Sequence, residues 1–334
     1  MIDTTSKDPV LLMCSPEFYS ISGPDPETGK YANKFAEESH KEYLKDRQAF
    51  VDRAKKQWGE YQSTLTALGV QVVELEPQKN QGDLVFTADP TLSIVSQDAV
   101  DADPRVITMT SRFSNTERQV EVEHNVRFVE TFDPTRGIAS SHFNTEGTGD
   151  NYYDPFRDVY WSGYTDNPSR ENASAGRSDI RAHKGLEAVT GVPVVSMAVE
   201  EPFFHIDTCM TPLTNGHVIA YKDGMKPEAF ETLMREGFER YGMNPDEYLI
   251  LVDKEDAKQY ACNLRCVGDT LIMPQVSEGL QDRLKSKGYE VICLDMSVFI
   301  NDGGAMHCLT NNLNEQRVKG GTCVQKGYER KLAL

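Results

Sequence analysis

The stretch Asn301-Asp302-Gly303-Gly304-Ala305-Met306-His307-Cys308-Leu309-Thr310-Asn311 is the segment around which we organise the rest of the chain. Its two adjacent glycines carry no Cβ, so the backbone can turn tightly there and leaves room beside the sulfur of Cys308. A single cysteine is weak evidence for a catalytic site by itself. The segment indicates a nucleophile only if acid–base groups elsewhere in the chain accompany it.

Candidate acid–base groups occur on three separate upstream segments. Residues 203–209 are predicted to form a strand in which His205 and Asp207 share one face, because alternate residues of a strand point the same way. Asp89 and Glu146 lie in two further segments. A cysteine, a histidine and several carboxylates on separate segments are the set that a nucleophilic cysteine enzyme needs. The pattern therefore indicates an enzyme.

The same residues also have ordinary structural interpretations. His205 alone is typical of a core histidine, Asp89 of a turn residue before a proline, and Glu146 of a solvated carboxylate. Cys209 is predicted to be a core residue. His307 beside Cys308 suggests a cysteine–histidine pair, but neighbouring residues of a strand point in opposite directions, which argues against that pair.

Composition limits the class of protein. The chain has 334 residues, 39% of them hydrophobic, so we expect a globular protein of one large or two ordinary domains. Its formal charge of −17 argues against nucleic acid as a partner and fits a small cationic substrate, although such a charge also serves solubility alone.

The cellular setting is predicted from what the sequence does not contain. The first residues show no secretory signal, and no apolar run approaches the roughly 20 residues of a membrane span. The 7 cysteines follow no disulfide framework, and Cys262 and Cys266 lack a second pair at zinc spacing. We therefore expect a cytoplasmic protein without a membrane partner or a metal site.

Hydrophobic periodicity predicts alternating strands and helices, which is an α/β or α+β class. Residues 133–150 are predicted to be a long loop, and Ser178 is predicted to cap a helix. No internal repeat, dinucleotide fingerprint or phosphate-binding loop is apparent. The predicted strands are 9–14, 70–75, a pair within 84–95, 106–110, 159–164, 192–199, 217–221, 248–252, 270–273 and 289–294; the predicted helices are 50–68, 116–128, 178–190, 227–241 and 276–287.

Taken together, the motifs resemble the guanidino-group-modifying superfamily of arginine deiminases, dimethylarginine dimethylaminohydrolases, arginine dihydrolases and amidinotransferases. Seven pieces occur in the order found in that family: 82–89, 111–113 with 117–119, 146–150, 161–164, 177–179, 204–209 and 303–309. The resemblance implies a five-bladed α/β propeller with pseudo-fivefold symmetry, in which residues 1–334 form one catalytic domain. It also implies that the enzyme uses no metal and no organic cofactor.

The resemblance assigns roles to individual residues. Cys308 is the nucleophile, His205 is the general acid and base, and Glu146 either orients His205 or contacts the guanidinium. Asp89 and Asp207 hold the guanidinium, which carboxylates recognise well through paired N–H bonds. Four further positions match substrate-binding residues of the family: Arg112 and Arg177 for the α-carboxylate, and the acidic residues Asp83 and Asp150.

Some features depart from the family pattern. Asp89 replaces the asparagine typical of the bacterial arginine-dihydrolase branch, which favours one-step hydrolysis. The link 165–176 is longer than usual, which leaves Arg170 as a substitute for Arg177. Residues 23–26 replace an Asn-Pro that lines the site in relatives, so the part of the substrate away from the guanidinium can differ from free arginine.

Three functions remain open at this stage. The first is a hydrolase that converts arginine or an N-methylated arginine to a citrulline-type product. The second is an amidinotransferase, or an arginine dihydrolase giving ornithine. The third is a non-catalytic binding protein with the family fold, which has no need for the thiol. The sequence also leaves open a homo-oligomer.

Overall fold

A computed structural model describes residues 8–24, 29, 31, 36–96, 105–165 and 177–325 of the chain. The alternative arginine, Arg170, lies outside these residues, as does most of the predicted long link 165–176. Of the departing loop 23–26, only Gly23 and Pro24 are described.

The strands of the described residues form five separate small sheets, four of three strands and one of four. In sheet order they are β15 (Asn311–Asn312), β1 (Val10–Cys14) and β2 (Gln71–Leu75); β16 (Glu315–Gln316), β3 (Thr91–Ser96), β4 (Arg105–Thr110) and β5 (Gly137–Ser140); β6 (Asn151–Asp154), β7 (Val159–Tyr164) and β8 (Val194–Ala198); β9 (Met210–Pro212), β10 (Val218–Ala220) and β11 (Leu249–Leu251); and β12 (Arg265–Val267), β13 (Thr270–Pro274) and β14 (Glu290–Leu294).

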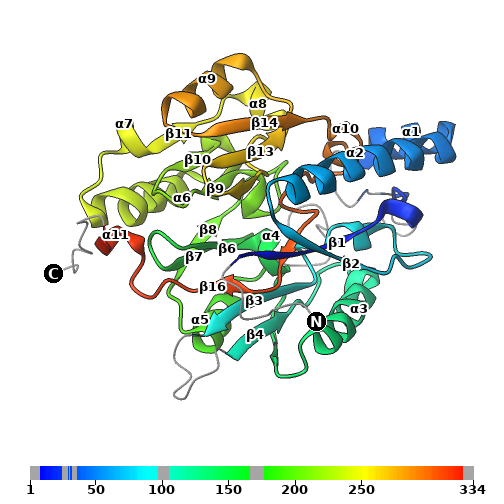
Figure 1. Cartoon of the computed structure of the whole chain (residues 1–334), viewed down its shortest axis with the longest axis horizontal. Coiled ribbons are helices and arrows are strands. Elements are labelled where there is room, and N and C mark those ends of the chain that lie inside the picture. Colours follow the sequence, from blue (N-terminus) through cyan, green and yellow to red (C-terminus); the bar gives the residue numbers. More distant parts are fainter. Residues whose placement is uncertain are drawn as a thin grey trace.

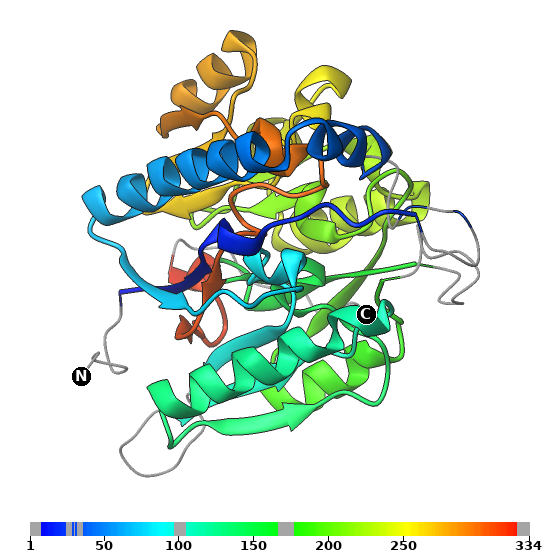
Figure 2. The same cartoon turned by 90° about the vertical axis from the view of Figure 1, so that its right-hand side faces the viewer.

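Each sheet repeats one arrangement. A central strand pairs antiparallel with one neighbour and parallel with the other, as β7 does with β6 and β8. A parallel pair needs a crossover connection, and a helix provides it in every sheet. These helices are α2 (Arg47–Ala67), α3 (Gln119–Phe132), α5 (Ala182–Thr190), α6 (Pro227–Thr232) and α9 (Glu278–Ser286). Figure 1 shows them spread around the outside of the strands, and Figure 2 shows the long α2 along one side.

The remaining helices have at most 10 residues. They are α1 (Ala36–Lys45), α4 (Gly147–Asp150), α7 (Pro245–Tyr248), α8 (Lys254–Lys258), α10 (Ser297–Ile300) and α11 (Thr322–Gln325), with a π-helical turn at Leu233–Phe238. Single 3₁₀ turns occur at Pro16–Phe18, Gly82–Val85, Thr116–Arg118, Ile206–Thr208, Lys222–Gly224 and Glu239–Tyr241. No helix in the described part of the chain is long and apolar enough to cross a membrane.

The strongest sequence patterns are confirmed. Helix α2 begins where the side chain of Asp46 accepts a hydrogen bond from the Ala49 N–H, and it buries residues at the predicted spacing, including Trp58 and Tyr61. Strand β1 is buried along its whole length, as its unbroken hydrophobic run indicates. Helix α6 begins with Pro227 at its first position, where the missing N–H costs no helical hydrogen bond.

Three predictions about these elements were wrong. Residues 84–95 contain one strand instead of a pair, because Gly82–Val85 forms a 3₁₀ turn. The predicted loop 133–150 contains β5 and α4. Ser178 does not cap α5, which begins at Ala182; its hydroxyl donates to Asp150 instead. Residue pattern alone showed no internal repeat, because strands of two to six residues leave too little pattern to compare.

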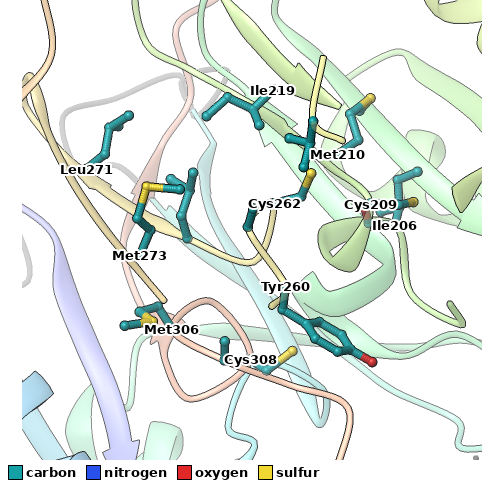
Figure 3. Close-up of a cluster of buried hydrophobic side chains, with 14 of the residues drawn as sticks. Ile206, Cys209, Met210, Ile219, Tyr260, Cys262, Leu271, Met273, Met306 and Cys308 are labelled. Atoms are coloured by element: carbon teal, nitrogen blue, oxygen red, sulfur yellow. The ribbon is translucent and has the colours of Figure 1, made fainter. Parts of the chain in front are cut away.

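One large cluster of buried side chains connects most of the molecule. It includes the aromatic face of α2 and extends to the segment that carries Cys308. Figure 3 shows Cys308 in this cluster beside Tyr260 and Met306, with Cys262 and Cys209 farther along it. The predicted core role of Cys209 is confirmed, and Cys262 is buried as well, whereas Cys266 is only half-buried in β12.

Candidate active site

Cys308 lies in a series of turns that follows α10, not in a strand. A Cβ added at Gly304 would lie 3.0 Å from the Cβ of Cys308 and 2.9 Å from the ring of Phe86. The room that glycine leaves beside the cysteine, predicted from the sequence, is therefore present. The carbonyl of Cys308 accepts a hydrogen bond from the Ala88 N–H, which links the segment to the residues around Asp89.

The sulfur of Cys308 is buried among polar groups. The side-chain amide of Asn263 donates to it at 3.1 Å, and the sulfur lies 3.4 Å from Oδ2 of Asp207. Burial, Asp207 and Asp89 raise the pKa of the thiol well above its ordinary value, although the Asn263 hydrogen bond opposes them. The free thiol is therefore neutral near pH 7, and a cation bound beside it would favour the thiolate.

His205 lies at a bend just before the 3₁₀ turn Ile206–Thr208, so the predicted strand is wrong here. Its Nε2 is 2.8 Å from Oε2 of Glu146, and its Nδ1 is 3.7 Å from Oδ1 of Asp89. Burial lowers the pKa of His205, but Asp150, Asp89 and Glu146 outweigh burial and raise this pKa to about 9. The imidazole is therefore positively charged at neutral pH.

Glu146 forms the N-terminal boundary of α4 and is fully buried. Besides His205, its carboxylate accepts from Arg177 Nη1 at 3.2 Å and from the Ser114 hydroxyl at 3.1 Å. Burial opposes ionisation, but Arg177 and His205 hold the pKa of Glu146 well below its ordinary value. These contacts favour the first of the two predicted roles, in which Glu146 orients His205.

Asp89 is held by a cation that the sequence predictions omitted. Nη1 of Arg118 donates to Oδ2 of Asp89 at 2.8 Å, while its other nitrogens donate to both oxygens of Glu121. Oδ1 of Asp89 has no hydrogen-bond partner among the described residues. A Cβ at Gly149 would lie 2.7 Å from this Oδ1 and 2.8 Å from Nδ1 of His205, which explains why the motif contains glycine there.

Asp207 lies under the sulfur and is fully buried. Its Oδ2 is 2.8 Å from Nδ1 of His307 and 3.4 Å from the sulfur of Cys308. Its Oδ1 has no hydrogen-bond partner in the part of the chain that the structure describes. His307 and Cys308 therefore share one carboxylate.

A pocket opens beside these groups. Five of the nine predicted site residues line it, and two more, Glu146 and Asp207, contact its wall from behind. The lining residues are Ser22, Ala36, Asp83, Phe86, Asp89, Asn115, Arg118, Arg177, Phe204, His205, Asp302, Gly303, Gly304 and Cys308. Arg177 also lies over the ring of Phe204, with 4.6 Å between its guanidinium carbon and the ring centroid.

Two predicted substrate ligands are not brought into this pocket. Arg112 is exposed and lines a different surface hollow, because the buried neighbours Ser111 and Phe113 turn it outward. Asp150 is buried behind His205, where it accepts from the Ser178 hydroxyl at 2.5 Å and from the Ile206 N–H at 3.3 Å. Burial raises the pKa of Asp150 to about 7. Asp150 therefore contacts the framework of the pocket and not its lining.

Three residues at the site were missed by the sequence analysis. Arg118 belongs to one of the quoted motifs, but nothing in the motif distinguishes its buried role from a surface ion pair. Asn263 lies far from every motif, and its Oδ1 accepts from the N–H groups of Ala305 and Cys308. Asp302 precedes the glycine pair and accepts from the Tyr19 hydroxyl at 3.0 Å. The one sequence feature that could have indicated Asp302 was its position in the segment that carries the predicted nucleophile.

Comparisons with known proteins identify the family of the chain. Residues 27–315 match the family model "N,N dimethylarginine dimethylhydrolase, eukaryotic". The bifunctional arginine dihydrolase/ornithine cyclodeaminase ArgZ of Synechocystis sp. is 29% identical over 307 residues, which are 91% of this chain. The N(G),N(G)-dimethylarginine dimethylaminohydrolase of Mycobacterium tuberculosis is 29% identical over 261 residues, which are 78% of this chain and 76% of that protein.

A solved structure extends the comparison. The product-bound N-terminal domain of ArgZ, described as an arginine dihydrolase, aligns with a TM-score of 0.73 and 25% identity over 93% of this chain and 99% of that domain. The chain spans only 38% of the length of full ArgZ. The predicted superfamily is confirmed: the chain belongs to the N,N-dimethylarginine dimethylhydrolase family of guanidino-group-modifying proteins.

Proposed function

We propose that this protein is a hydrolase that uses Cys308 to break a C–N bond of a guanidino substrate. The observation that carries the proposal is one pocket lined by Cys308, His205 and Asp89, with Glu146 and Asp207 directly behind its wall. A non-catalytic binding protein would have no use for a cysteine beside a charged histidine. The carboxylates of Asp89 and Asp207 suit a planar guanidinium, because carboxylate oxygens accept its N–H groups.

The first half of the reaction forms a covalent intermediate. The guanidinium binds beside Asp89 and Asp207, whose unpartnered Oδ1 atoms are available to accept its N–H groups. The positive charge favours loss of the Cys308 thiol proton to water, and the sulfur of the resulting thiolate bonds to the guanidinium carbon. The C–N bond to the leaving amine breaks, and His205 gives that amine a proton. Because Nε2 of His205 is held by Glu146, Nδ1 is the nitrogen that delivers the proton.

The second half releases the product. Neutral His205 takes a proton from water, and the resulting hydroxide attacks the thiouronium carbon. The C–S bond then breaks as the new hydroxyl group passes its proton to the departing sulfur, which gives the ureido product, the neutral thiol of Cys308 and charged His205. Glu146 and Arg177 hold His205 in place throughout. Every bond and proton in this sequence is assigned to Cys308, His205, substrate or water, so the proposal requires no metal and no organic cofactor.

For the substrate, we propose arginine or an N-methylated arginine. Arg177 lines the pocket and is the cation that we assign to the α-carboxylate, in place of the exposed Arg112. Asp83 and Asp302 lie in the same lining, where they suit an α-ammonium group. Relatives include proteins named for both arginine dihydrolase and dimethylaminohydrolase activity, which supports this substrate class.

We also propose that the reaction stops at the ureido product. Asp89 is an anion that attracts a cationic substrate, but it gains far less from a neutral ureido group, so the product leaves. An asparagine could both donate to the ureido oxygen and accept from its nitrogen, and so retain the product for a second hydrolysis. Asp89→Asn should therefore lose rate but gain some ornithine-type product. Ornithine as the main product of the wild type would assign the chain to dihydrolase chemistry instead.

The repeated sheets suggest how the site is framed. We propose that the five sheets are the five blades of a propeller with the pocket near its axis, formed by a single domain of residues 1–334. The free cysteines support a reducing, cytoplasmic setting. The proposed chemistry does not depend on oligomerisation, because one chain supplies every residue to which a role is assigned.

A substrate panel tests the proposed function. Purified protein would be incubated with arginine, N-methylated arginines and agmatine, while ammonia, methylamines and amino-acid products are followed by chromatography. Mass spectrometry of acid-quenched enzyme should find the covalent adduct on Cys308, and Cys308→Ser should form none. An adduct on Cys14 or Cys209, or transfer to an added amine in preference to water, would contradict the hydrolase assignment.

A further inference from the structure

A second pocket lies on the other side of the nucleophile segment. It shares no lining residue with the Cys308 pocket, and His307 faces it while the neighbouring Cys308 faces the first. Its polar lining includes Arg265, Glu315 and Tyr160. The mechanism proposed above uses none of these three side chains.

Tyr160 provides the first sign that this pocket binds a ligand. Its side chain lies in β7 and is only 1% exposed, yet its hydroxyl has no hydrogen-bond partner among the described residues. A buried polar group without a partner is costly, and native structures rarely keep one. By contrast, the hydroxyl of Tyr153 in the same lining donates to Asp158 at 3.1 Å. The Tyr160 hydroxyl is therefore available to a bound molecule.

Two opposite charges provide the second sign. Arg265 is half-buried and is held by Thr310, which accepts from its Nε at 3.1 Å, but it forms no ion pair within the described residues. Glu315 is also half-buried, and the side chain of Asn312 donates to it at 2.7 Å. The pocket thus presents a fixed cation and a fixed carboxylate that are not paired with each other.

We propose that this pocket binds a small α-amino acid in its zwitterionic form. The ligand's carboxylate would lie against Arg265 and accept from the Tyr160 hydroxyl, while its ammonium group would lie against Glu315. Such a ligand satisfies all three side chains at once, whereas a simple anion or a simple cation satisfies only part of them. The pocket is smaller than the Cys308 pocket, so the smallest amino acids suit it best.

The position of the pocket connects the ligand to the nucleophile. Thr310, which holds Arg265, also donates to the carbonyl of Met306, two residues before Cys308. The His307 ring stacks on Tyr152 of this lining, with centroids 4.3 Å apart, and contacts the carboxylate of Asp207 that lies under the Cys308 sulfur. The ligand would therefore contact residues that position the nucleophile.

Isothermal titration calorimetry with glycine tests the proposal on the full chain. Glycine should bind with a Kd of roughly 1–10 mM, as expected for so small a ligand, while acetate and methylammonium should bind at least about tenfold more weakly. Tyr160→Phe should fold normally, because the Tyr160 hydroxyl has no partner among the described residues, and it should weaken glycine binding by about 5- to 10-fold. Glu315→Gln should weaken glycine but not acetate.

Arg177→Gln is the matched control, because the Cys308 pocket also suits amino acids. Its affinity for glycine should equal that of the wild type. If Arg177→Gln loses glycine binding and Tyr160→Phe does not, glycine occupies the Cys308 pocket and the proposal is wrong. Acetate binding as tightly as glycine would also overturn it, as would the absence of any glycine binding. None of these readouts depends on turnover, so they remain informative even if the proposed hydrolase activity is not found.

Discussion

Replacing Glu146 with glutamine should change the charge state of His205. In the structure the Glu146 carboxylate accepts from Nε2 of His205 at 2.8 Å and helps to raise the pKa of His205 to about 9. A hydrogen bond to a charged group contributes about 1.5–3 kcal/mol, and 1.36 kcal/mol corresponds to 1 in pKa. Glu146→Gln should therefore lower the pKa of His205 by about 1–2, to roughly 7–8.

This difference is large enough to measure near pH 8. With a pKa of about 9, roughly nine-tenths of wild-type His205 is charged at pH 8; in the variant the charged fraction should be about one-tenth to one-half. If protonation of the leaving amine limits the rate, kcat at pH 8 should fall by about 2- to 10-fold from this cause alone. The amide group of the new glutamine can also place a donor against the Ser114 N–H, so the variant should lose some unfolding free energy as well.

NMR titration of the His205 imidazole, in a Cys308→Ser background without turnover, measures this pKa directly. His205→Asn identifies the signal among those of the 7 histidines. Glu236→Gln is the control, since that carboxylate pairs with Arg240 and not with a histidine. A titration of His205 that is unchanged in Glu146→Gln would refute the view that Glu146 sets its charge.

Three further predictions concern stability and the space around the nucleophile. Gly304→Ala should lose most of its turnover, because the added Cβ would lie 3.0 Å from the Cβ of Cys308. The control is Gly59→Ala in helix α2, where an added Cβ meets nothing within 4 Å. This variant should keep its turnover and gain up to about 1 kcal/mol of unfolding free energy in urea. Arg118→Gln should lose about 3–5 kcal/mol of unfolding free energy, because Asp89 and Glu121 lose their buried cation; an unchanged urea midpoint would show that this network is dispensable. The folded-state pKa of His205, about 9, lies above its ordinary value of about 6.5, so its stabilising effect is complete below pH about 6.5 and is lost as pH rises through about 9. Unfolding free energy should therefore fall between pH 7 and 9 in the wild type, and less so in His205→Asn.

The parts of the fold that sequence predicted well are those where one element buries a long, regular pattern. Helix α2 and strand β1 are such elements, since each carries several consecutive turns or residues of burial. The sequence could not show that Ser178 hydrogen-bonds Asp150 instead of capping a helix, because that choice depends on a carboxylate brought close by folding. Residue pattern alone did not show the repeat of five sheets for a similar reason, since strand register and pairing, not residue type, define that repeat.

At the site, sequence predicted residue types better than their partners. Cys308, His205 and Asp89 line one pocket as expected, and Glu146 contacts His205 directly. Arg112 could not be distinguished from Arg118 by sequence, since both are arginines in the same motif region, only a few residues apart. Burial decides between them: Arg118 is 6% exposed and ion-paired to Asp89, whereas Arg112 is exposed.

The pairing of β1 with β15 has a consequence for biosynthesis. The Val10 N–H donates to the side chain of Asn314, 304 residues later, and β16 adds to the sheet of β3 in the same region of the chain. Contacts between residues so far apart in sequence require the closure of a very long loop, which makes their formation slow. A nascent chain on the ribosome would leave the hydrophobic strand β1 without its β15 neighbour until residues 311–312 have been synthesised. Chaperones that cover exposed strand edges would therefore matter most for the segment that contains β1.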